Sequence, residues 1–313
     1  MPRRPSSLLD TRIIYCGDCL DQLPKLPDHC VDLIYIDPPF NSNRNYEAFW
    51  GETKEKRAFE DRHASTQAYL EFMRPRCVEL ARVLKPTGSF YYHCDWHASH
   101  YVKVMLDQIF GENNFRNEII WQRSNSHNEA RQYGRIHDTI FFYTGSDTYT
   151  WNAIRLPYSR EQMKRYKQDA DGRWYKGENL TAERLDSDSG KFEWRGTKPP
   201  PSRGWGYSVE QLEKWWREGL ILTKKDGTPR MDGQKVYLDD TLGKGLQSIW
   251  TDIPRIANTS SERLGYPTQK PLVLLDRIIA ASTNENDIVL DAFLWLRDRS
   301  CVRAESETPV DRH

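Results

Sequence analysis

The sequence predicts an α/β fold that carries a long insertion. In the first third of the 313-residue chain, short β-rich runs alternate with segments of helical periodicity, and the same alternation returns after Tyr266. Residues 145–264 lack this pattern. A chain of this length can bury a core without disulfides or a metal ion, and its 38% hydrophobic content argues against general disorder.

Charge and composition restrict the functional classes. Lysine plus arginine and aspartate plus glutamate both number 45, which excludes a polycation that coats nucleic acid indiscriminately. Between residues 151 and 230, however, seventeen basic residues face twelve acidic ones, and six of the eleven tryptophans lie there. Six irregularly spaced cysteines indicate reduced thiols and a cytoplasmic location. The sequence has no run of eighteen apolar residues, so no membrane-spanning helix is predicted. Residues 1–10 contain no apolar stretch long enough for a secretory signal.

The first predicted strand covers residues 31–36 and ends at Asp37, because the two prolines that follow cannot continue a ladder. Apolar residues at helical spacing then predict a helix over residues 66–84, with Ser65 or Thr66 as its N-cap. Pro75 is expected to kink or split this helix. The Lys-Pro-Thr-Gly run at 85–88 predicts a stop before a second strand over 89–93. His93 and Asp95 are expected at the carboxyl edge of this strand, lining the same cleft as Asp37.

The rest of the chain supplies further elements. A helix is predicted up to Phe110 and Gly111, followed by two adjacent antiparallel strands, 118–121 and 139–143, with a polar linker that includes Arg131 and Arg135. The middle region predicts hairpin turns at 171–172 and 226–227, an extended segment at 198–204 and a helix over 208–217. A helix over 271–282 and a strand over 287–291 complete the pattern.

The most informative motif is Asp37-Pro38-Pro39-Phe40, at the carboxyl end of the first strand. Ligands of open α/β sheets bind at this edge. The Asp37 carboxylate and the Pro38 carbonyl would present two acceptors to the two hydrogens of an exocyclic amino group, and Phe40 would stack on a planar ring. A turn with an exposed aspartate cap would give the same four residues, so other segments must decide.

Those segments are Tyr15–Leu20, with Asp18 at its centre, Gly265–Pro271, and Asp287–Phe293. In this order, the motifs resemble the DNA amino-methyltransferases of the permuted β arrangement. The resemblance implies a doubly wound, Rossmann-like sheet with S-adenosylmethionine as cofactor. It also implies a catalytic half at 1–144, an inserted DNA target-recognition segment at 145–264 and a cofactor-binding half at 265–293.

The implied activity is methyl transfer to adenine N6 of a base flipped out of specific double-stranded DNA. Cytosine-N4 enzymes more usually begin their motif with serine, and protein-glutamine or RNA methyltransferases with Asn-Pro-Pro. Two alternatives stay open: cytosine-N4 methylation, and a catalytically inactive remnant that still binds DNA. A restriction subunit and a second copy of the chain are the candidate protein partners.

The resemblance assigns residues to three roles. The catalytic set is Asp37, Pro38, Pro39 and Phe40. The cofactor set is Asp18, Asp37, Thr268, Gln269, Lys270, Pro271, Asp291 and Phe293. Basic and aromatic composition adds a DNA-binding set of Arg195, Lys198, Arg203 and Trp205. No metal site is expected, because the single Cys16-x2-Cys19 pair lacks a matching second pair.

The pattern breaks after Phe293. The family places two glycines in the loop that follows, and Trp295 and Arg297 stand there instead. Residues 294–313 form an atypical tail without clear periodicity. This departure suggests a reading-frame change or truncation and a fold that is incomplete at its C-terminus. Without the glycine loop, we expect weak cofactor binding and reduced stability.

Overall fold

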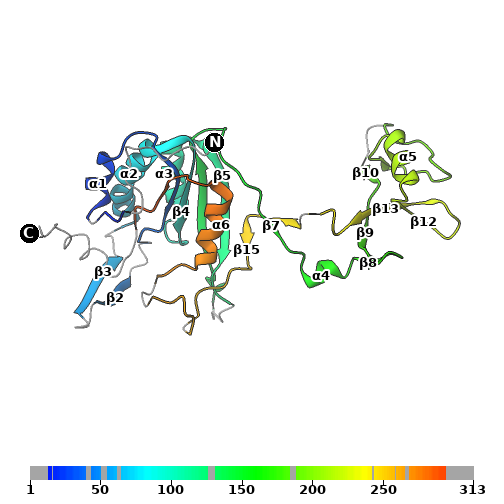
Figure 1. The fold of residues 1–313 in the computed structure, drawn as a ribbon. Helices are drawn as coiled ribbons and strands as arrows, with labels where there is room; N and C mark the ends of the chain where they lie inside the picture. The colour runs from blue at the N-terminus through cyan, green and yellow to red at the C-terminus, as the bar shows by residue number, and fades with distance from the viewer. Residues whose placement is uncertain are drawn as a thin grey trace, which may run out of the picture. The chain divides into compact units, whose positions relative to one another are not determined.

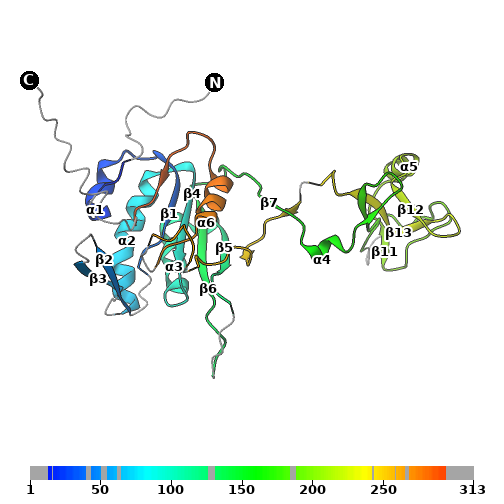
Figure 2. The same ribbon diagram turned by 60° about the horizontal axis from the view of Figure 1, so that its bottom comes forward.

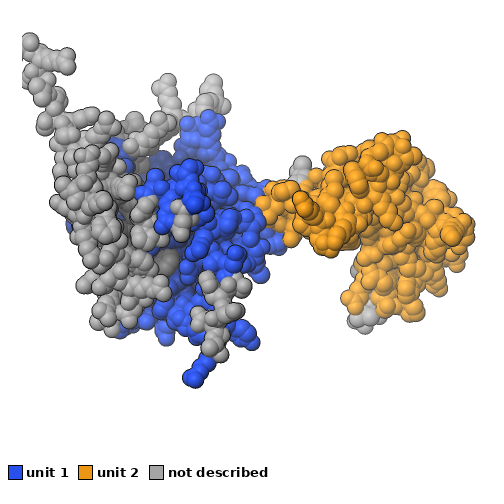
Figure 3. Space-filling model, turned by 90° about the horizontal axis from the view of Figure 1, so that it is seen from below, with its two compact units in different colours: residues 1–154, 247–313 blue, residues 155–246 orange. Residues whose placement is uncertain are grey.

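The computed structural model describes residues 13–15, 17–39, 44–50, 55–61, 65–125, 131–183, 188–241, 243–257, 259–264 and 268–293. The chain forms two compact units: unit 1 contains residues 1–154 and 247–313, and unit 2 contains residues 155–246 (Figure 3). Unit 2 lies within the 145–264 region in which the sequence predicts an insertion.

A six-stranded mixed sheet forms the centre of unit 1. Its order is β15-β5-β6-β4-β1-β16. β1 pairs in parallel with β4 and β16, and β15 pairs in parallel with β5, whereas β6 runs antiparallel to its neighbours β4 and β5. The strands are β1 (Val31–Ile36), β4 (Leu84–Cys94), β5 (Phe115–Gln122), β6 (His137–Thr144), β15 (Ile249–Trp250) and β16 (Val289–Leu290).

Helices cover both faces of this sheet (Figures 1 and 2). On one face, α2 (Thr66–Val83) and α3 (Ser99–Phe110) pack on apolar residues such as Ile34 and Tyr92. On the other, α6 (Leu272–Ser282) lies against Tyr91, whose hydroxyl is 2.7 Å from Ser282 Oγ. This arrangement confirms the doubly wound α/β fold expected from the sequence.

Most of the predicted elements of unit 1 are present, but their ends differ by a few residues and several short elements were not predicted. α2 continues through Pro75 without splitting, and Ser65 is its N-cap. β4 begins at Leu84 rather than at residue 89, because its first residues also pair with β1 across an irregular register, and Lys85 forms an ion pair with Asp32. The sequence reading also missed the antiparallel pair β2 (Arg44–Trp50) and β3 (Glu55–Asp61).

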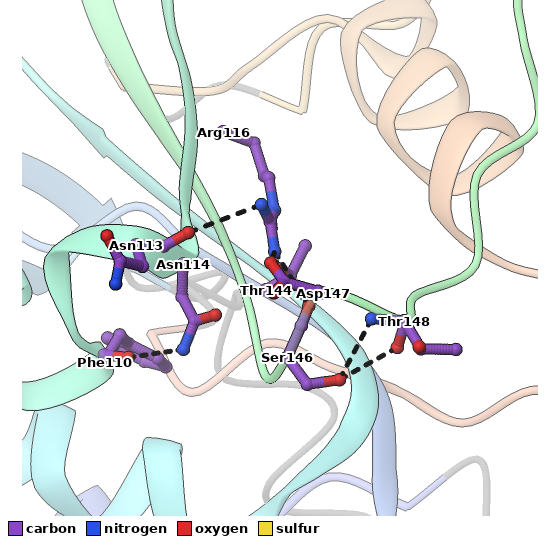
Figure 4. Close-up of polar contacts among 8 residues, drawn as sticks. All are labelled: Phe110, Asn113, Asn114, Arg116, Thr144, Ser146, Asp147 and Thr148. Atoms are coloured by element: carbon purple, nitrogen blue, oxygen red, sulfur yellow. Dashed lines mark hydrogen bonds and ion pairs between the residues drawn. The ribbon is translucent and has the colours of Figure 1, made fainter.

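Arg116 joins the start of β5 to the end of β6, as Figure 4 shows. Its guanidinium donates to Thr144 Oγ1 at 2.8 Å and to Ser146 O and Asp147 Oδ1, both at 2.9 Å. The longer contact, to Asn113 O at 3.4 Å, comes from the turn η2 (Glu112–Asn114). These bonds fix the end of the β5–β6 pair at which β5 begins and β6 ends.

Unit 2 has a sheet and a core of its own. Its four-stranded sheet runs in the order β12-β13-β9-β8, with glycines at positive φ in the predicted turns at Gly172 and Gly227. The core contains Leu180, Trp194, Trp205, Leu212 and Ile221. The elements of unit 2 are β7 (Arg155–Leu156), α4 (Arg160–Met163), β8 (Lys167–Gln168), β9 (Trp174–Glu178), β10 (Thr181–Glu183), β11 (Arg203–Trp205), α5 (Val209–Arg217), β12 (Ile221–Thr223), β13 (Pro229–Tyr237) and β14 (Lys244–Gly245).

Two short helical elements, α1 (Cys19–Gln22) and η1 (Leu23–Lys25), precede β1. None of the helices in the described ranges is long and apolar enough to cross a membrane.

Candidate active site

Asp37 lies directly after β1, at the carboxyl edge of the sheet. Pro38, which follows it, is buried. The Asp37 carboxylate is paired with Lys270: the ammonium Nζ lies 2.5 Å from Oδ2, and the two side chains are only 13% and 11% exposed. The contact joins the Asp-Pro-Pro turn to the segment that leads into α6.

Asp291 is the third charged group at this edge. It follows β16, the strand next to β1, and its Oδ1 accepts the backbone N–H of Phe293 at 2.9 Å. Close packing and the neighbouring Asp37 charge raise the pKa of Asp291 to about 7, while Lys270 acts in the opposite direction. Asp291 still keeps an exposed surface, where solvent limits the effect of burial. Lys270 therefore pairs directly with Asp37, and its charge also acts on Asp291.

The segment 268–271 is held by its neighbours in the chain. The Gln269 amide donates to Glu262 O at 2.8 Å and accepts from Leu264 N at 2.7 Å. Pro271 is the N-cap residue of α6, and Glu262 Oε1 accepts the first helical N–H, from Leu272. The carbonyl of Thr268 contacts Lys270 Nζ at 3.3 Å. Gln269 therefore shapes this turn, and it is the side chain of Lys270 that reaches Asp37.

Asp18 belongs to a different group of contacts. Its side chain caps α1 through Leu20 N at 2.9 Å and pairs with the buried Arg76 of α2 at 2.6 Å. The Leu20 hydrogen bond, together with Arg76, keeps the pKa of Asp18 below its usual value. The guanidinium of Arg76 also lies 3.6 Å from the centre of the Phe72 ring. The structure thus gives Asp18 a structural role in attaching α1 to α2.

A chain of buried polar residues runs across the face of the sheet that carries α6. Tyr35 Oη lies 2.8 Å from His93 Nδ1, and His93 Nε2 lies 3.2 Å from Asp138 Oδ2. Arg123, which is half-exposed, pairs with the other Asp138 oxygen at 2.8 Å. Tyr35 precedes Asp37 by two residues, and side chains of a strand repeat their direction every two residues. The polar chain therefore begins beside the candidate catalytic aspartate.

This polar chain was only partly found from the sequence. His93 and Asp95 were expected at the carboxyl edge of their strand, and the structure places them at the end of β4 and directly after it. Tyr35 and Asp138 were missed. The only signal in the sequence is that polar residues occur in strands whose other residues are apolar.

The four predicted DNA-binding residues differ in their exposure and in their contacts. Trp205 is 2% exposed, and its indole N–H donates to Phe192 O at 2.9 Å, so Trp205 is a core residue of unit 2 and its prediction is corrected. Arg203 donates to Thr181 at 2.8 and 2.7 Å. Arg195 pairs with Glu213 at 2.7 Å, whereas Lys198 is exposed.

Some predicted residues cannot be placed. Phe40, Cys16 and the tail 294–313 lie outside the described residues. In the described part of the chain, no group of three or more histidine, cysteine, aspartate or glutamate side chains is arranged to hold a metal ion.

Comparison with known proteins identifies the family. The family model for DNA methylases matches residues 31–294. The chain belongs to the DNA methylase family. The match spans β1, Asp37, all of unit 2 and the Lys270–Asp291 region, so the site described above lies within it.

Individual relatives of this DNA methylase are more distant. Type II methyltransferase M.EcaI of Enterobacter cloacae is 31% identical over 264 residues, which are 83% of this chain and 56% of that protein. The Mod subunit of the type III restriction-modification enzyme StyLTI of Salmonella typhimurium is 28% identical over 88% of this chain and 47% of its own length. The DNA adenine methyltransferase YhdJ of Escherichia coli is 24% identical over 91% of this chain and 71% of its own length.

The chain thus spans about half the length of the first two of these relatives. Among solved structures, M1.HpyAVI in complex with its cofactor SAM aligns over 93% of this chain and 88% of its own, with 16% identity and a TM-score of 0.39.

Proposed function

We propose that this chain contains the catalytic region of a DNA methyltransferase that transfers a methyl group from S-adenosylmethionine to adenine N6 of a flipped-out base. One observation supports this most: Asp37 stands at the carboxyl edge of β1, before two prolines, and reaches Lys270 in the segment that leads into α6. In an open α/β sheet, this is where a ligand binds.

The chemistry requires an acceptor for the amino group of the base. The lone pair of that nitrogen is delocalised into the ring, which makes it a poor nucleophile. Hydrogen bonds to Asp37 and to the Pro38 carbonyl would favour a pyramidal nitrogen and would stabilise its developing positive charge. S-adenosylmethionine would supply the methyl group and leave as the neutral sulfide, and the amino nitrogen, held by Asp37 and Pro38, would release one proton to solvent. Stacking on Phe40 would offset part of the cost of extruding the base, by about 1–3 kcal/mol.

The charges at this edge suit a cofactor that carries a sulfonium and an amino group. Lys270 pairs with Asp37 and its charge also acts on Asp291, so these three residues carry one net negative charge when both carboxyl groups are ionised. When bound, S-adenosylmethionine supplies an activated methyl group. We assign its binding to Asp37, Asp291 and Phe293 and to the turn Thr268-Gln269-Lys270-Pro271, whose backbone leads into the N-terminus of α6. The ion pair with Arg76 holds Asp18 in place, so we assign Asp18 a supporting role in cofactor binding.

Target recognition is assigned to unit 2, with Lys198 and the outer faces of Arg195 and Arg203 toward DNA. A restriction subunit as partner is consistent with the likeness to a type III Mod subunit. Cytosine-N4 methylation is the second candidate, because an exocyclic amino group of cytosine offers the same two hydrogens to Asp37 and Pro38. The aspartate in the first position of the motif favours adenine.

The deciding experiment is transfer of a tritium-labelled methyl group to mixed-sequence DNA, followed by nuclease digestion and identification of the modified base. We expect N6-methyladenine from the wild-type chain and no product from Asp37→Ala, with DNA binding retained. Asp188→Ala, a fully exposed aspartate of unit 2, is the matched control and should keep wild-type transfer. A chain that binds DNA but transfers nothing is the inactive remnant, and full activity of Asp37→Ala refutes the catalytic assignment.

A further inference from the structure

A stack of one indole, one imidazole and one guanidinium lies just after β4. The rings of Trp96 and His97 have centroids 3.8 Å apart and are inclined by 29°. The guanidinium carbon of Arg135 lies 3.8 Å from the centre of the Trp96 ring. Trp96 nevertheless remains 41% exposed. We call these three residues the Trp96 stack.

The stack has a built base. Asp95 is buried, and its carboxylate accepts the backbone N–H of His97 at 3.0 Å and contacts His97 Nδ1 at 2.7 Å. These bonds fix the turn between β4 and α3. They account for the positions of Asp95 and His97 as parts of the fold. They do not account for a large exposed indole that carries an arginine on its ring.

The stack also lies close to the candidate catalytic aspartate. β1 and β4 run in parallel, and Ile36 pairs with Tyr92, so Asp37 and Asp95 leave the same edge of the sheet within a few residues of each other.

Arg135 differs from Arg123 and Arg277 of the same unit in its side-chain partners. Within the described ranges, its side chain makes a 3.2 Å hydrogen bond to Gln132 and the contact with Trp96, and no carboxylate lies within ion-pair distance of it. By contrast, Arg123 pairs with Asp138 and Arg277 with Asp252. The same segment exposes Arg131 and leaves Tyr133 98% exposed. Arg135 therefore offers a positive charge without an acidic partner among the described residues, and the Trp96 ring, covered on one face by Arg135 and on the other by His97, holds that guanidinium in place.

We propose that Trp96 and Arg135 form a DNA-contacting platform on unit 1, in which Arg135 binds a backbone phosphate near the extruded nucleotide and Trp96, stacked between Arg135 and His97, holds the guanidinium in position. The inference rests on the proposed function for the identity of the ligand as double-stranded DNA. Charged guanidinium groups bind phosphate oxygens through strong hydrogen bonds, and a guanidinium on the face of a tryptophan ring is held there by a cation–π interaction. The platform adds a DNA contact that does not depend on unit 2.

The test is binding of the full chain to a fluorescein-labelled mixed-sequence DNA duplex, measured by anisotropy over a range of salt concentrations. Arg135→Gln is expected to weaken binding about tenfold and to reduce the slope of log K against log salt by about 1, because one phosphate contact is lost. Trp96→Ala is expected to weaken binding about threefold, less than Arg135→Gln does, because the charge of Arg135 remains but the ring that positions it is lost.

Matched controls separate these effects from general ones. Arg74→Gln removes an exposed arginine that also bonds to a glutamine, and Trp151→Leu removes a half-exposed tryptophan, so both should bind as the wild type does. Arg135→Lys should keep the wild-type slope, and Trp96→Phe should recover part of the lost affinity, which excludes misfolding as the cause.

The outcomes distinguish this inference from the proposed function. Affinities of Arg135→Gln and Trp96→Ala within twofold of the wild type would overturn the platform and leave the proposed function intact. If DNA binding depends on both residues but the chain transfers no methyl group, the platform is supported and the proposed methyltransferase activity is refuted. A wild-type chain that does not bind the duplex would overturn both.

Discussion

Lys270 Nζ lies 2.5 Å from Asp37 Oδ2, so that residues 233 positions apart in the sequence form one buried ion pair. The ammonium also lowers the pKa of Asp291, which the Asp37 charge raises. The charge state of this edge therefore belongs to three residues together. The charge of Lys270 offsets part of the repulsion between the carboxylates of Asp37 and Asp291. None of the sequence motifs alone indicates this arrangement.

Lys270→Met should raise the pKa of Asp291 above its value of about 7, because the favourable charge of the Lys270 ammonium is lost while the Asp37 carboxylate remains. Titration of carbon-13-labelled aspartate carboxyl groups by NMR measures the change. Lys225→Met, an exposed lysine of unit 2, should leave the Asp291 titration unchanged. An Asp291 titration that is the same in Lys270→Met and the wild type would show that the ammonium does not act on it.

Cofactor binding should depend on the ionisation of Asp291. Because its pKa is raised to about 7, the carboxyl group is mostly neutral below pH 7 and anionic above it, where it can attract a cationic ligand. Calorimetric titration should show that the affinity for S-adenosylmethionine rises about tenfold, or about 1.4 kcal/mol, from pH 6 to pH 8. Asp291→Asn should remove this dependence. A wild-type affinity that does not change with pH would contradict the assignment of Asp291.

Local patterns predicted those parts of the fold and site that depend on neighbours in the chain. The stop of β1 at Asp37 follows from the two prolines, and the turns of unit 2 follow from Asp-Gly pairs. Cross-strand pairing has no such local signal. It decides that β4 begins at Leu84 despite the Pro-Thr-Gly run, and that Trp205, in a basic and aromatic segment, faces a core instead of DNA.

The polar chain of Tyr35, His93 and Asp138 illustrates the same limit, and its energetics can be tested. Asp138 is 3% exposed and holds both His93 and Arg123. Asp138→Asn should lower the free energy of unfolding of unit 1 by about 3–5 kcal/mol, because it removes one partner of a buried pair. Tyr35→Phe removes one hydrogen bond and should cost about 1 kcal/mol. Urea denaturation measures both.

The decisive comparison is between the losses of unfolding free energy in Asp138→Asn and Tyr35→Phe. An equal or larger loss in Tyr35→Phe would mean that the tyrosine hydroxyl, not the carboxylate, organises the chain. Ser146→Ala, whose hydroxyl interacts at an exposed turn, should stay within about 0.5 kcal/mol of the wild type and serves as the surface control.

The core role of Trp205 leads to a prediction for unit 2. Gly190 has φ 77°, and a Cβ atom there would lie 2.4 Å from the Trp205 carbonyl oxygen, whereas Gly172 has a similar φ of 79° but open space around it. Gly172→Ala should therefore cost about 1–2 kcal/mol, the penalty of the left-handed conformation alone. Gly190→Ala should cost more than about 3 kcal/mol, because backbone must also move. Tryptophan fluorescence during urea unfolding measures both, since two of the core residues are tryptophans. Equal losses in the two variants would show that the Trp205 backbone yields easily, and a tryptophan held so loosely could turn outward to DNA, which would reverse its assignment to the core.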